Sequence, residues 1–124
     1  MRAKPNRPIT EAEATIVRIA LIRASVVPSA ADLTATIANL RVVDQCNCGC
    51  ASVDFAFAGE ERPRPIADGV ATTPAGGRVG VIVFGTTDAI TGLEIYDHGA
   101  GQDDLKLPVP DSISPWSESA TPVK

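Results

Sequence analysis

The chain has 124 residues, of which 44% are hydrophobic, 21% charged and 4% aromatic, and its formal net charge is −4 at pH 7. This size and composition indicate a single small domain over residues 1–124, with a core built largely from small side chains. The acidic balance argues against a nucleic-acid partner, because phosphates require clustered Lys and Arg, and no apolar run is long enough to span a bilayer.

The first elements in the chain are a short basic segment and a helix. Residues 1–9 carry three basic side chains without an apolar pattern, so we expect a frayed and solvated N-terminus. Thr10 and Glu13 have the spacing of a capping box at the start of an apolar run. This pattern predicts a helix over about 10–24, which ends before Pro28.

A second start signal follows directly. Ser29 stands three residues before Asp32, and Leu33, Ile37 and Leu40 recur at helical spacing. The segment is therefore predicted as a second, shorter helix.

From residue 41 onward the hydrophobic period changes to two, which is typical of strands. Residues 41–45 and 53–57 are predicted to form a hairpin with the cysteine run at its tip, and a single bulged strand is the alternative. Residues 59–77 are rich in Pro and Gly and are predicted to be a loop. The runs at 78–84 and 93–96 predict a second hairpin.

The predicted fold class is α+β. Two N-terminal helices are expected to pack on a mainly antiparallel sheet of four or five strands built from the two hairpins. Residues 99–124 mix Gly, Asp, Pro and Ser and are expected to form a partly ordered tail.

The run from residue 46 to residue 50 holds all three cysteines, Cys46, Cys48 and Cys50. A straight strand would hold alternate sulfurs about 6.6 Å apart, too far for one zinc ion, but Gly49 could fold the segment around a metal. His98, the only histidine, would complete a Cys3His site if the two hairpins adjoin. The cysteines and His98 are therefore the candidate metal ligands, with zinc as the candidate cofactor.

Other interpretations of the cluster stay open. Asp44 or Asp97 could replace the imidazole as an oxygen ligand. Two of the cysteines could instead be buried as small hydrophobes, or a Cys48–Cys50 disulfide could form. A reactive thiol would need a neighbouring base or cation, for which Arg41 is a candidate together with the histidine.

The odd number of cysteines in one tight cluster favours a reducing compartment, so we expect a cytoplasmic protein. The leading hypothesis is a small module without catalytic activity that binds an unknown protein partner through a sheet face, a sheet edge or the 59–77 loop. A structural zinc protein is the alternative, and a thiol-dependent enzyme is the third class. A strand edge rich in Val and Ile could also pair two copies into a homodimer.

A helix followed by Val42, the cysteine cluster and a late strand at 92–95 resembles a group of small bacterial proteins with a Cys-x-Cys-Gly-Cys-Pro signature. The resemblance covers residues 30–57 and 79–98, and Ala51 stands where proline is common in that group. It implies a compact α+β domain and carries no activity.

Overall fold

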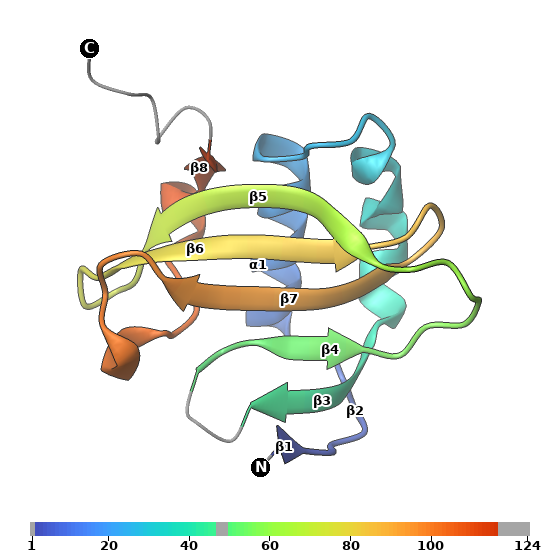
Figure 1. Cartoon of the computed structure of the whole chain (residues 1–124), viewed down its shortest axis with the longest axis horizontal. Helices are drawn as coiled ribbons and strands as arrows, with labels where there is room; N and C mark the ends of the chain where they lie inside the picture. The colour runs from blue at the N-terminus through green and yellow to red at the C-terminus, as the bar shows by residue number, and fades with distance from the viewer. Residues whose placement is uncertain (1, 47–49, 117–124) are drawn as a thin grey trace.

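The computed structural model describes residues 2–46 and 50–116 (Figure 1). Within this part, eight strands form one antiparallel sheet in the order β1-β3-β4-β7-β6-β5-β8, with β2 also paired to β3. The elements in chain order are β1 (Arg2–Ala3), β2 (Arg7–Pro8), α1 (Glu11–Arg23), η1 (Ala30–Asn39), β3 (Arg41–Cys46), β4 (Val53–Phe55), β5 (Arg64–Thr72), β6 (Arg78–Gly85), β7 (Ile90–Asp97), η2 (Gln102–Asp104), η3 (Pro110–Ser112) and β8 (Ser114–Pro115).

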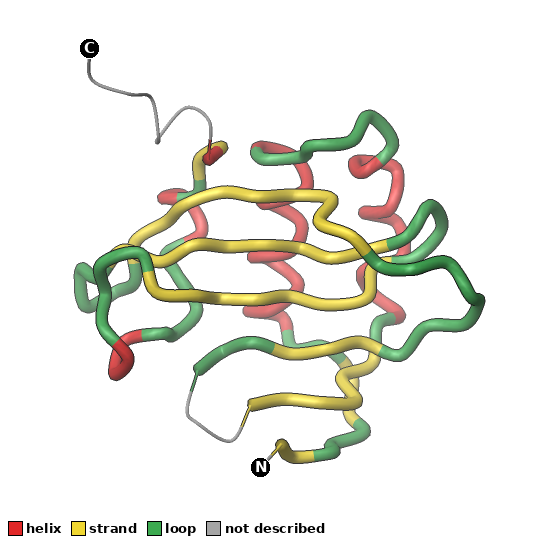
Figure 2. Tube along the Cα trace, viewed as in Figure 1, coloured by secondary structure: helices red, strands yellow, loops and turns green. Residues whose placement is uncertain are grey.

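The sheet has one covered face and one open face. Figures 1 and 2 look onto the open face, with α1 and the 3₁₀ segment η1 behind the sheet. Alternate residues of β6 and β7 point to the helices and are fully buried, among them Val81, Val83 and Leu93. The core therefore lies between the helices and the sheet, and the remaining alternate residues of the strands form the open face.

The capping box predicted for α1 is confirmed. The Glu13 backbone N–H donates to Thr10 Oγ1 at 3.0 Å, and the Thr10 N–H donates to Glu13 Oε1 at 2.9 Å. Two backbone N–H groups at the N-terminus of the helix are satisfied in this way, so α1 begins where its sequence signal places it.

The predicted second helix is wrong in type. The segment from Ala30 to Asn39 is a 3₁₀ helix, and the Ser29 side chain makes no capping hydrogen bond. The hydroxyls of Thr34 and Thr36 donate to the carbonyls three residues earlier, at 2.9 and 2.7 Å. Such side-chain bonds compete with the α-helical ladder, which explains the tighter winding.

The predicted sheet of four or five strands is also wrong, because eight strands form the described sheet and the fold is mostly β. The largest addition is β5, which occupies most of the segment expected to be a loop. Pro65 lies at a shift of register between β5 and β6, where proline is tolerated. A side chain at Gly69 would overlap the backbone of Ser114, so this glycine allows β8 to approach closely.

Other segments of the chain cover the outer edge of β5. Val26 N–H donates to the Ile66 carbonyl and Asp68 N–H to the Ala24 carbonyl, each at 3.0 Å. Further along, β8 pairs with the middle of β5, and the Thr72 carbonyl accepts from the segment before η3 at 2.8 Å. An added strand at this edge would have to displace these segments.

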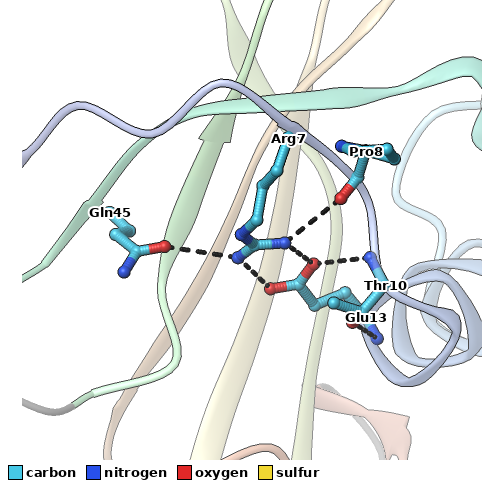
Figure 3. A network of polar contacts seen from close by, with 5 residues as sticks. All are labelled: Arg7, Pro8, Thr10, Glu13 and Gln45. Atoms are coloured by element: carbon cyan, nitrogen blue, oxygen red, sulfur yellow. Dashed lines mark hydrogen bonds and ion pairs between the residues drawn. The ribbon is translucent and has the colours of Figure 1, made fainter.

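The opposite edge of the sheet is covered by the N-terminal segment, for which we expected a frayed terminus. Strands β1 and β2 both pair with β3. Figure 3 shows that Arg7 reaches from β2 to the start of α1, where its guanidinium makes two hydrogen bonds of 3.0 Å to the Glu13 carboxylate. The same guanidinium also donates to Gln45 of β3 at 3.3 Å. Arg7 thus joins strand, helix and sheet.

The C-terminal region is described as far as Trp116 and crosses back to the sheet. Its elements η2, η3 and β8 lie within the segment that we expected to be a partly ordered tail. The Trp116 ring packs edge-on against the His98 ring, with 4.9 Å between the ring centroids. The contact places the end of the described chain beside the end of β7.

Candidate functional site

The cysteine run joins β3 to β4, and these two strands pair antiparallel, as the hairpin prediction requires. Cys46 ends β3, and Cys50, which is half-buried, precedes β4. Residues 47–49, including Cys48, lie outside the described residues. Cys46 is disulfide-bonded, so it would have to be reduced before it could offer a thiolate to a metal.

The two hairpins adjoin through β4 and β7, which was the condition for a ligand role of His98. The structure nevertheless places His98 beside Trp116, and its backbone N–H donates to the Arg78 carbonyl at 3.1 Å. Within the residues that the structure describes, no group of three or more His, Cys, Asp or Glu side chains could hold a metal. Since Cys48 is not among them, the Cys3His zinc site stays a prediction.

The open face of β5, β6 and β7 is organised in rows of residues that pair across the strands. One row contains Val70, Gly80 and Tyr96. A side chain at Gly80 would overlap the Tyr96 ring, so the ring lies flat over the glycine. Val70 is only 3% exposed although it belongs to the open face. The Tyr96 ring therefore covers Gly80 on the open face.

Strands β4 and β7 separate after a short stretch of pairing. Only Val53 and Asp54 of β4 pair with β7. At the next position the Ser52 hydroxyl takes the place of a backbone partner, because it accepts from Ile95 N–H at 2.9 Å and donates to the Ile95 carbonyl at 3.3 Å. The backbone of the hairpin thus moves away from β7 while the polar groups of Ile95 stay satisfied.

A hollow of about 430 Å³ opens where the two strands separate. We call it the carboxylate hollow, because Asp54, Glu94 and Asp97 line it together with Tyr96. Cys46 and Cys50 lie at the same hollow, whereas the residues that line it do not include His98. Sequence reasoning had grouped the cysteines with His98, or with Asp44 or Asp97 in its place; of these residues, the structure brings Cys46, Cys50 and Asp97 to the same hollow.

A second hollow of about 530 Å³ lies beside the first on the open face. We call it the phenylalanine hollow, because Phe55, Phe57 and Phe84 line it. Its rim carries the ion pair between Lys4 and Asp44, with 3.3 Å between Nζ and Oδ2. The hollow thus combines an apolar wall with one charged pair.

The local electrostatics keep the carboxylate hollow negative. Backbone N–H groups of Gly101 and Gly99 donate to Asp97 Oδ1 at 3.0 and 2.8 Å and lower the pKa of Asp97 from its ordinary value of 3.8. Burial raises the pKa of Tyr96 above 10.0, and the negative charges of Asp68 and Glu94 raise it further. At neutral pH the site therefore has an ionised carboxylate beside a neutral phenol.

The position of Tyr96 can be tested by its titration, because it is the only tyrosine of the chain. We expect the ultraviolet absorbance of tyrosinate to appear at a pH above 10.0, and Asp68→Asn to move this transition downward. Asp88→Asn, in the exposed turn between β6 and β7, removes the same charge and should leave the transition in place. An unchanged transition in Asp68→Asn would contradict the arrangement of the open face.

Sequence reasoning named four of the residues that line the hollows, Cys46, Cys50, Asp44 and Asp97, and missed the others. Glu94 and Tyr96 alternate with the buried Leu93 and Ile95, which could have marked them as members of a second face. The role of Ser52 could not be found in this way, because its partner lies 43 residues away and the pairing of β4 with β7 leaves no local signal.

No protein-family model, curated protein or solved structure matches this chain. None of the helices in the described part is long and apolar enough to cross a membrane. The function must therefore be argued from the open face itself.

Proposed function

We propose that this chain is a small binding module without catalytic activity, and that its ligand occupies the open face of the sheet. The observation that carries the proposal is the pair of adjoining hollows, of about 430 and 530 Å³, on the face of the sheet opposite α1 and η1. Hollows of this size are typical of sites for small ligands or for a few side chains of a partner.

The arrangement of the edges supports the same choice. Of the three surfaces that the sequence left open, the outer edge of β5 is occupied by other segments of the chain, and the expected loop is largely this strand. The open face is the third of these surfaces. We keep the cytoplasm as the proposed location, because three cysteines within five residues lack the wide spacing of a secreted disulfide framework, although Cys46 itself is disulfide-bonded.

Two exposed apolar residues offer a matched pair of variants for the test. Phe57 is 43% exposed and lines the phenylalanine hollow, whereas Ile22 is 63% exposed and lies on α1, behind the sheet. Neither side chain belongs to the core, so serine at either position should leave the fold intact.

The experiment is an NMR screen of small aromatic amines, acids and neutral compounds against the whole chain. We expect amide shift changes that cluster on β4, β6 and β7 around the hollows. Phe57→Ser should weaken the binding of the compounds found, and Ile22→Ser should not. Binding that clusters elsewhere, or affinities that Phe57→Ser leaves unchanged, would argue against the open face as the site.

A further inference from the structure

The two hollows form one continuous groove. Asp54 and Phe84 line both of them, so the carboxylate hollow and the phenylalanine hollow meet at these two side chains. Asp54 comes from β4 and Phe84 from β6, with Gly92 of β7 paired to each of them. Because Gly92 has no side chain, the Asp54 carboxylate can lie over this strand, with Oδ1 3.1 Å from the position that a Cβ atom at residue 92 would take.

The described side chains that line this groove carry mainly negative charge. Asp54, Glu94 and Asp97 line the carboxylate hollow, and the described residues that line it include no Lys, Arg or His. The described lining of the phenylalanine hollow contains a single cation, Lys4, and its ammonium is engaged by Asp44. The chain as a whole carries a formal charge of −4. A positively charged group is attracted to such a surface and an anion is repelled.

Aromatic side chains add a second reason for a cation. Tyr96 and Phe84 line the same hollow as the three carboxylates. The face of an aromatic ring attracts an ammonium or guanidinium group, and this attraction adds to that of nearby carboxylates. The neighbouring Phe57, which is 43% exposed, offers apolar surface to an uncharged part of the same ligand.

We infer that the groove binds an extended segment of a partner protein, which places a Lys or Arg side chain in the carboxylate hollow and an apolar side chain in the phenylalanine hollow. In an extended peptide the side chains i and i+2 lie on the same side, about 6.6 Å apart, which suits two hollows that share lining residues. This inference deepens the proposed binding function and rests on it.

The test uses three short peptides and one small amine. The first peptide is acetyl-Phe-Gly-Lys-amide, the second replaces Lys by Glu, and the third replaces Phe by Ala. The amine is 2-phenylethylamine, which has the ring and the charge without a peptide backbone. Each compound is titrated into the whole chain at low ionic strength, and Kd is measured from amide shift changes of the groove residues.

We expect the Phe-Gly-Lys peptide to bind in the groove about tenfold more tightly than either of the other peptides and than the amine. Added salt should weaken its binding. Glu94→Lys, at an exposed position of β7, should weaken it by a further factor of about ten. Asp32→Lys is the matched control, because this exposed residue lies on η1, behind the sheet, and should leave Kd nearly unchanged.

The possible outcomes distinguish a failure of the inferred ligand class from a failure of the proposed binding function. Equal binding of the Lys and Glu peptides in the groove would overturn the cationic ligand while the binding function stands. If the amine binds as tightly as the Phe-Gly-Lys peptide, the ligand need not be a peptide segment, and that part of the inference would be wrong. If the peptides and the compounds of the screen all leave the groove residues unshifted, the inference and the proposed function both fail.

Discussion

Glu13→Ala is expected to lower the free energy of unfolding by about 3 kcal/mol, one of the two largest effects that the structure predicts. The Glu13 side chain is 9% exposed, and it accepts from both the Arg7 guanidinium and the Thr10 backbone. Its removal leaves a partly buried guanidinium without this partner and opens the N-terminus of α1. Equilibrium unfolding in urea measures the loss.

Glu11→Ala is the control for this prediction, since Glu11 also lies in the first turn of α1 but is exposed. Its loss should cost no more than about 1 kcal/mol, the contribution of a carboxylate near a helix N-terminus. Arg7→Ala and the double variant complete a mutant cycle. A coupling energy near zero would contradict the role of Arg7 in joining β2 to α1.

The Arg7–Glu13 pair also predicts how stability depends on pH. Burial, the largest single influence, would raise the pKa of Glu13, but the hydrogen bonds from Arg7 and Thr10 outweigh it and the pKa falls below its ordinary value of 4.5. The contribution of the ionised Glu13 to stability is therefore complete above pH 4.5 and lost as the pH falls through the lowered pKa. Wild-type stability should decline more steeply over this acid range than that of Glu13→Gln, and equal slopes would contradict the lowered pKa.

The local signals in the sequence were sufficient for α1 and for four of the strands. Thr10 and Glu13 bond to each other across three residues, so their pattern alone specifies the start of the helix. The period of two gave β3, β4, β6 and β7, because residues that alternate between a buried and an open face also alternate in hydrophobicity.

The missed strand β5 shows where such signals fail. Pro65 and Gly69 usually mark loops, but in this strand they serve an irregular pairing and a close approach of β8. Both roles depend on segments far away in the chain. The candidate site also depends on distant segments, because the groove lies where β4 pairs with β7. No sequence pattern near Asp54 or Glu94 predicts this pairing.

Gly80→Ala is expected to lower the free energy of unfolding by about 2 kcal/mol, because the new methyl group would occupy the space of the Tyr96 ring. The ring would have to move away from residue 80 and lose its packing on the sheet. Gly92→Ala is the matched control on the same face, where the nearest atom is an oxygen of the flexible Asp54 side chain at 3.1 Å. That substitution should cost less, as measured by urea unfolding.

A Tyr96→Ala background distinguishes the ring from other causes. With the ring absent, Gly80→Ala should become neutral or stabilising by up to about 1 kcal/mol, because alanine is favoured over glycine within a strand. A cost that persists in this background would mean that the backbone at Gly80, rather than Tyr96, rejects the methyl group. The same cycle bears on function, since Tyr96 lines the carboxylate hollow and a displaced ring would change its wall. Gly80→Ala should therefore weaken binding in the groove although residue 80 does not line it.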